Sequence, residues 1–252
     1  MKNNAIIRIV LWCLTLAILI SILAFGMLRT NSFASGYILR LKNRSQDDSN
    51  NAGVSGSSFQ AEKTDSVRSI QIDWFSGQID IRPGDVNTVT VSETAPSKPE
   101  YTMYCRQNGN KLAISACRDA ILSTNGNLKK DLTVLIPRDF KLDTLEIDAA
   151  SASVNVTDLQ IEEVKVNTAS GVSQFENCTV EDLDLDTASG DLSYQGTLDN
   201  LEVDAASANI SAVFSRSIER SSFSGSSKTL KPVLLFSSSS GRRTALCSYG
   251  DT

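Results

Sequence analysis

Four Asp or Asn residues at regular spacing have the clearest arrangement for chemistry in this sequence. They are Asp148, Asn167, Asp186 and Asp204, and they recur every 18 or 19 residues. A fold that superimposes the repeats would stack them in one row, and rows of oxygen ligands suit hard cations such as calcium. The sequence favours a structural role instead, because Asp and Asn stabilise chain reversals and because the glycine-rich nonapeptide of calcium-binding β-rolls is missing. The four residues therefore remain a weak candidate metal site.

Enzyme chemistry finds little support in the sequence. The segment 186–190, DTASG, shares letters with the active-site loop of aspartic proteases, but Ala188 stands where those enzymes need glycine. The corresponding units carry Asn167 or Ala205, which a catalytic pair of carboxylates would not tolerate. The chain contains no histidine, so the commonest general base and metal ligand near neutral pH is absent. We expect no enzymatic activity, no catalytic residue and no cofactor.

The five cysteines do not have the spacing of a zinc site. They are Cys13, Cys105, Cys117, Cys178 and Cys247. Cys105 and Cys117 flank Asn108-Gly109, a dipeptide typical of two-residue hairpin turns. With that turn Cys105 would lie opposite Leu112, so a disulfide between Cys105 and Cys117 would need another geometry.

Negative charge is concentrated in the middle of the chain. Residues 142–212 contain 15 Asp or Glu and one basic residue, Lys165, whereas the whole chain has a net charge of −5. Such a surface repels nucleic acid and other polyanions, so we expect no nucleic-acid partner. We expect these charges to form a solvated surface that keeps the domain soluble. The alternative is a docking face for cations or for a basic partner.

Four similar units of 18 or 19 residues would position these side chains. They read LEIDAASASVNV, VKVNTASGVSQF, LDLDTASGDLSY and LEVDAASANISA, and they begin at Leu145, Val164, Leu183 and Leu201. Each unit predicts a strand, a corner and a second strand, because apolar and polar residues alternate on both sides of Asx and small residues. One unit buries too little apolar surface alone, so the units should stack. The predicted fold is all-β, a β-solenoid-like stack; the constant period disfavours the alternative, a sandwich of antiparallel strands.

Weaker copies extend the pattern in both directions. Residues 70–77 fit the same frame, with 79–81 as the second strand, and residues 222–225 and 239–241 look like degraded copies. Further strands are expected at 88–92, 101–106, 112–115 and 132–136. Four aromatic residues in this region are expected to close the end of the column or, alternatively, to form a carbohydrate platform: Trp74, Phe75, Tyr101 and Tyr104.

An apolar segment near the start predicts a transmembrane helix. Residues 9–28 carry no charge, and 20 helical residues span roughly 30 Å, the thickness of the hydrocarbon core. Residues 1–30 are therefore assigned to a short tail and a helix in the lipid bilayer. A signal peptide cleaved after Ala34 is the alternative, although its apolar region usually has about 7–15 residues. Flanking charges leave the orientation open. Residues 31–66 predict a flexible linker, and residues 67–252 the β-strand-repeat domain.

Residues 67–245 resemble the bacterial putative-adhesin family of β-strand-repeat domains of unknown function. The resemblance rests on the unit from Asp186 to Gly190, on its variants at Asn167 and Asp204, and on residues 73–77. The N-terminal anchor also resembles members from Gram-positive bacteria. The resemblance implies a single-pass protein of the cell membrane with the repeat domain outside the cell. The family has no catalytic residues to carry over.

These features leave three functions open. We expect a non-enzymatic binding or scaffold domain at the cell envelope, in contact with an envelope polymer or a membrane protein. The alternative is an accessory sensor or regulator of envelope state, which would need a membrane partner because only about eight residues precede the apolar segment. A β-helix polysaccharide lyase or hydrolase is least favoured, since it needs basic side chains beside its carboxylates and residues 142–212 offer only Lys165.

Overall fold

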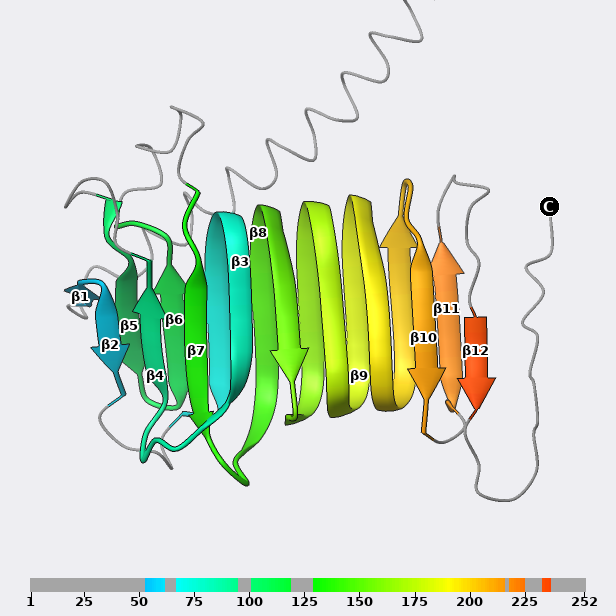
Figure 1. The fold of residues 1–252 in the computed structure, drawn as a ribbon, viewed down its shortest axis with the longest axis horizontal. Coiled ribbons are helices and arrows are strands. Elements are labelled where there is room, and N and C mark those ends of the chain that lie inside the picture. The colour runs from blue at the N-terminus through cyan, green and yellow to red at the C-terminus, as the bar shows by residue number, and fades with distance from the viewer. Residues whose placement is uncertain are drawn as a thin grey trace, which may run out of the picture. The chain divides into compact units, whose positions relative to one another are not determined.

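A computed structural model describes residues 53–61, 67–94, 101–118, 129–215 and 218–224, together with the backbone of 233–236 (Figure 1). The chain divides into two units, 1–50 and 51–252, and the first lies outside the described residues. All named elements of the second unit are β-strands, which confirms the all-β prediction. The predicted transmembrane helix at 9–28 falls outside the described residues and stays a prediction. No helix within the described part is long and apolar enough to cross a bilayer.

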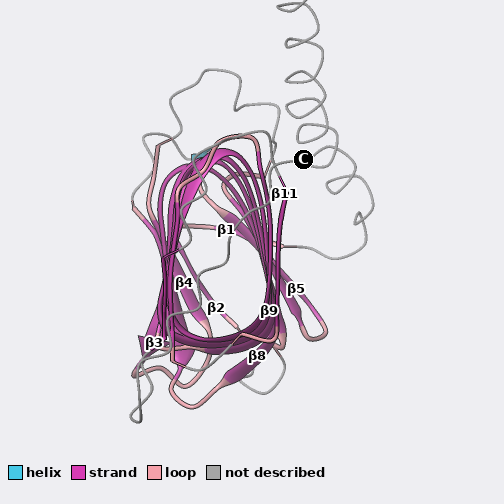
Figure 2. Ribbon diagram, turned by 90° about the vertical axis from the view of Figure 1, so that its right-hand side faces the viewer, coloured by secondary structure: helices cyan, strands magenta, loops and turns pink. Residues whose placement is uncertain are grey.

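Six strands form a continuous coil. They are β3 (Ser69–Gly84), β8 (Lys141–Thr157), β9 (Gln160–Ala205), β10 (Ile210–Phe214), β11 (Arg220–Ser224) and β12 (Val233–Phe236). β9 runs through several corners without leaving strand conformation, so its successive turns follow one another along the coil (Figure 1). Seen from the end, the turns superimpose as a flattened ring with two long sides (Figure 2). Each turn thus carries one strand on each side of a narrow interior.

The strands of successive turns pair in parallel with the register expected from the repeat. Asp73 lies opposite Asp148 in the pairing of β3 with β8, and Asp148 lies opposite Asn167 in the pairing of β8 with β9. The early unit at 70–77 therefore belongs to the same frame as the regular units. At the other end β11 pairs in parallel with β9, so residues 222–224 of the suggested copy belong to the coil, although Ser224 lies opposite Asp204 and not at the position of the unit's serine. The copy at 239–241 lies outside the described residues.

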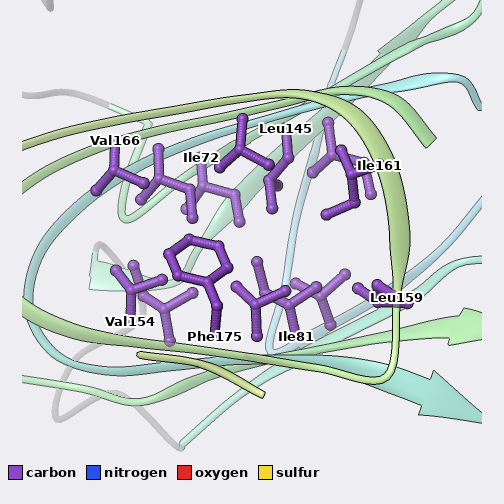
Figure 3. Close-up of a cluster of buried hydrophobic side chains, with 14 of the residues drawn as sticks. Ile72, Ile81, Leu145, Val154, Leu159, Ile161, Val166 and Phe175 are labelled. Carbon is purple, nitrogen blue, oxygen red and sulfur yellow. The ribbon is translucent and has the colours of Figure 1, made fainter. Parts of the chain in front are cut away.

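The apolar side chains that begin the four units form an aliphatic spine inside the coil, as the predicted stacking requires. The side chains that begin the four units, Leu145, Val164, Leu183 and Leu201, are 0, 0, 2 and 3% exposed, and Leu145 lies directly opposite Val164. Side chains from the two long sides meet in the interior, as Leu145 and Ile161 do with Ile81 and Phe175 (Figure 3). Full burial of one such side chain stabilises the fold by about 1.5–3 kcal/mol, so each added turn contributes through the spine. The parallel stacking excludes the antiparallel sandwich.

An aromatic column fills one part of this interior. The rings of Phe175 and Tyr194 are 5.8 Å apart, and those of Tyr194 and Phe214 are 5.9 Å apart. Tilted rings at this spacing stabilise each other beyond the area they bury. The hydroxyl of Tyr194 donates to the backbone oxygen of Thr197 at 2.6 Å, so the one polar atom of the column is satisfied.

The corners need backbone conformations that most residues avoid. Asp158 and Asn177 lie 19 positions apart, with φ of 55° and 54°, and Asp and Asn tolerate this region better than other non-glycine residues. At another corner Gly171 has φ of 127°, and a Cβ there would lie 2.3 Å from the backbone oxygen of Ala152. Glycine is required at that position because the turns stack backbone against backbone.

Shorter strands pack at the N-terminal end of the coil. They are β1 (Val54–Ser55), β2 (Ser58–Gln60), β4 (Thr90–Glu93), β5 (Tyr104–Asn108), β6 (Lys111–Ser115) and β7 (Leu132–Pro137). β6 and β7 pair in parallel with the two halves of β3, while β4 and β5 add antiparallel to β7 and β6. The four strands predicted between 88 and 136 are confirmed, with ends shifted by no more than three residues.

Two of these short strands fall within the predicted linker. β1 pairs with β5, and β2 pairs with β4, both antiparallel. The prediction of a linker is therefore wrong for residues 53–61. The segment has no apolar periodicity to reveal a strand, and its order comes from the edges of β4 and β5, with Phe59 packed against the core and Ala61 buried.

The hairpin between β5 and β6 differs from the predicted one by one residue. Asn108 pairs with Lys111, so the turn residues are Gly109 and Asn110, and Cys105 lies opposite Ile114 instead of Leu112. Gly109 has φ of 58°, which suits the first central position of a type II′ turn, a position that favours glycine. Neither Cys105 nor Cys117 is in a disulfide bond, and both are buried.

Candidate functional site

One long side of the coil carries eight of the 15 acidic residues in the segment 142–212. Along the first strand of each turn, apolar residues point inward and charged or polar residues alternate with them. We call the set that alternates with the inward apolar residues the acidic face, in which Asp148 is covered by its neighbours: Glu146, Asp148, Glu163, Lys165, Asn167, Asp182, Asp184, Asp186, Glu202 and Asp204. The parallel register places these side chains in columns along the coil, at about 4.8 Å per turn.

The second long side has a different character. Its outward residues include Asn155, opposite Gln174 in the next turn, and Ser193, opposite Ser211. These side chains are polar and uncharged. The same side also carries Asp80, opposite Asn155, and Glu176, so negative charge is denser on the acidic face but is not confined to it.

The four predicted candidate ligands, Asp148, Asn167, Asp186 and Asp204, recur in the same frame on the acidic face. The structure places Asn167 directly beside Asp148, and the side-chain Nδ2 of Asn167 donates to Oδ1 of Asp148 at 2.8 Å. Asp148 is 4% exposed. Within the described parts of the chain, no group of three or more Asp, Glu, Cys or His side chains is arranged to hold a metal ion. The amide at Asn167 thus acts as a structural partner of the carboxylate.

The same Asn-to-Asp contact recurs between turns elsewhere. Three further asparagines donate Nδ2 to an aspartate Oδ1: Asn155 to Asp80 at 3.1 Å, Asn200 to Asp182 at 2.7 Å, and Asn209 to Asp191 at 3.0 Å. An amide between turns supplies a donor where a second carboxylate would repel the first. The sequence alone did not reveal these pairs, although two of them are separated by 18 residues, a spacing of the repeat.

Asp184 lies among other carboxylates of the acidic face. Partial burial raises the pKa of its carboxyl group, and the charge of Glu202 raises it further, while Lys165 acts in the opposite direction. Lys165 itself is 2.6 Å from Glu163. The acidic face is therefore only partly neutralised by its own residues.

At the corner beside the acidic face, Lys141 links two turns. Its Nζ lies 2.9 Å from Glu162 and 3.3 Å from Glu181, and these two contacts raise the pKa of Lys141. All three side chains are exposed, so the contacts contribute little to stability. They bring the carboxylates of two successive turns, Glu162 and Glu181, to one lysine.

A second site, missed by sequence analysis, lies between the short strands and the coil. The Nζ of Lys130 donates to Oε2 of Glu93, to the backbone oxygen of Tyr101 at 2.6 Å and to the backbone oxygen of Ala116. The Lys130 and Glu93 side chains are 4% and 0% exposed. The ring centroid of Trp74 lies 4.9 Å from Nζ. Nothing in the local sequence distinguishes Lys130 from Lys129, so only the three-dimensional contacts identify this site.

Burial governs the chemistry of this pair. Loss of hydration lowers the pKa of Lys130, and the contact with Glu93 partly opposes this shift. The indole Nε1 of Trp74 donates to the backbone oxygen of Lys130 at 2.9 Å, and Trp74 is fully buried. The proposed carbohydrate platform is therefore wrong for Trp74, whose ring belongs to the core.

The buried cysteines are poor nucleophiles. Burial raises the pKa of Cys105 to about 12 and that of Cys178 to about 11. The thiolate is the reactive form of cysteine, so neither side chain is activated at neutral pH.

The stacked parallel turns, the internal spine and the columns of outward polar residues define a β-helix-like domain. The chain belongs to the family described as Toastrack DUF4097, whose family model matches residues 67–219. One similar solved structure is a "putative cell adhesion protein" from Clostridium sporogenes, with 7% identity and a TM-score of 0.36 over 69% of this chain and 100% of that chain. A search of curated proteins gives no match.

Proposed function

We propose that this chain is a non-enzymatic, membrane-anchored protein of the cell envelope whose coil domain is exposed outside the cell as a binding or scaffold module. The apolar segment 9–28 supplies the anchor.

One observation carries the proposal: the outward side chains are held in columns, and the two long sides differ in charge. Paired strands fix each column, and hydrogen bonds such as Asn167 to Asp148 and Asn200 to Asp182 join neighbouring turns. A surface ordered before it meets a partner loses less conformational entropy on binding. Repeat folds commonly use such extended surfaces for contact. An envelope polymer or a membrane protein is the partner class that suits this location.

Protease treatment of intact cells tests the location. The full chain is expressed with a C-terminal epitope, and the cells are treated with a protease that cannot enter them. We expect the epitope to disappear while a cytoplasmic marker survives. Survival of the epitope until the cells are lysed would contradict an external domain.

Cross-linking in living cells then separates the scaffold role from the alternative, a sensor or regulator of envelope state. In the regulatory alternative, a membrane partner would carry the signal across the bilayer. Recovery of envelope polymer supports the scaffold role. Recovery of one defined membrane protein, lost when residues 9–28 are replaced by another apolar segment, supports the regulatory alternative.

A further inference from the structure

The Lys130–Glu93 site has the parts needed to form an amide bond. Lys130 Nζ, the attacking group, is in hydrogen-bond contact with the carboxyl group of Glu93. The backbone N–H of Met103 donates to the other carboxyl oxygen, Oε1, at 2.7 Å. A donor at that oxygen polarises the carbonyl group and stabilises the negative charge that develops there during attack.

We propose that Lys130 and Glu93 condense spontaneously into an intramolecular isopeptide bond between Nζ and Cδ. The two side chains are positioned by separate segments of backbone, since Glu93 ends β4 and Lys130 precedes β7. Holding two reactants together in this way is equivalent to an effective concentration of up to about 10⁵–10⁸ M. This advantage favours a reaction that is negligible between free side chains in water.

The reaction balances without any further reagent. A proton first passes from the Lys130 ammonium group to Oε2 of Glu93, which leaves a neutral amine beside a neutral acid. The Nζ lone pair attacks Cδ to form the C–N bond, and the charge on Oε1 is held by the N–H of Met103. The Cδ–Oε2 bond then breaks, and Oε2 leaves as water with a second proton from Nζ.

Burial makes the charge on Lys130 easier to remove before the reaction. Both side chains are almost completely shielded from water, and a low-dielectric site penalises two separate charges. The lowered pKa of Lys130 agrees with this tendency. The fully buried Trp74 lies beside Nζ and helps to exclude the water that would reverse the reaction.

The mass of the full chain, measured after denaturation, tests the proposal directly. We expect the wild-type protein to be lighter than its sequence mass by one water molecule. Tryptic digestion should give a branched peptide that joins the segments around Glu93 and Lys130, with no cleavage after Lys130. A wild-type chain at its full sequence mass, with Lys130 open to amine labelling after denaturation, would overturn the proposal.

Two variants serve as matched controls. Lys130→Arg keeps the positive charge but cannot form this amide, so the protein should have its full sequence mass. Glu93→Gln can form the same bond by releasing ammonia, and its product should have the same mass as the cross-linked wild type. Since the wild-type measurement decides the question, failure of a variant to fold does not affect the outcome, and neither result bears on where the protein is located.

Discussion

The side-chain amide of Asn167 donates a 2.8 Å hydrogen bond to the carboxylate of Asp148 in the preceding turn. The two residues lie in the same column of the acidic face. The amide supplies a donor where an aspartate would place two carboxylates side by side. The contact thus joins two turns and limits repulsion within a column of like charges.

Asn167→Asp should destabilise the protein by about 2 kcal/mol at neutral pH, since a hydrogen bond to a charged and buried carboxylate is lost and a like charge is added. The new carboxyl group would have a raised pKa in the folded state. The folded protein would then bind more protons than the unfolded chain, so the loss of stability should grow as pH rises. Urea unfolding at several pH values measures both effects. Asn209→Asp, at the more exposed pair with Asp191, should cost less; equal losses would contradict this account.

Asp184→Asn should reduce the pH dependence of stability. The folded-state pKa of Asp184 is raised by burial and by Glu202. The folded protein therefore holds a proton on Asp184 over a range of pH in which the unfolded chain has lost it. Stability contributed by this group falls as pH rises through that range. Thermal unfolding of both proteins from acidic to neutral pH should show a flatter curve for the variant, without a lower melting temperature at neutral pH. An unchanged slope would argue against the role of Asp184.

Gly171→Ala should be strongly destabilising, by about 2 kcal/mol or more, since both the backbone angle and the contact with Ala152 exclude a side chain. Gly109→Ala provides the matched control. Its φ is also positive, but nothing lies within 4 Å of the added Cβ, so the cost should be about 1 kcal/mol. Chemical denaturation of both variants measures the difference. Equal losses would show that stacking of the turns does not depend on glycine at position 171.

Tyr194→Phe should cost about 1 kcal/mol, since it removes the hydroxyl that donates to Thr197 and leaves the ring in place. Tyr194→Ala should cost about 3–5 kcal/mol, because it also removes the ring between Phe175 and Phe214. Equilibrium unfolding in urea distinguishes the two. Similar losses for both variants would mean that the aromatic column contributes little.

The sequence predicted the regular part of the fold well because each unit repeats the same strand–corner–strand pattern. The regular spacing of Leu145, Val164, Leu183 and Leu201 predicted that the turns stack, and these four side chains are buried in the interior of the stack. The same frame located β3 and β11, although their corner residues differ. In a repeat fold each turn contacts mainly its two neighbours, so the spacing of the repeat predicts which residues meet.

The irregular part was harder to predict, because its contacts are distant in sequence. β1 and β2 are ordered by edges that β5 and β4 provide, and their own residues show no apolar alternation. The same reason explains why the Lys130–Glu93 site was missed: its parts lie 37 positions apart and share no motif. In the hairpin, the choice between two adjacent turn positions depended on the backbone angle of Gly109, which the letters Asn-Gly do not specify.

The equivalence of successive turns has a consequence for how the domain can change in length. Residues 164–182 form one complete turn, whose first residue lies opposite Leu145 of the turn before. Duplicating or deleting such a segment would alter the height of the domain by about 4.8 Å. Each remaining strand would still pair in parallel with an equivalent strand. The coil domain can therefore become longer or shorter in steps of one turn, and the same kind of apolar core is kept at each length.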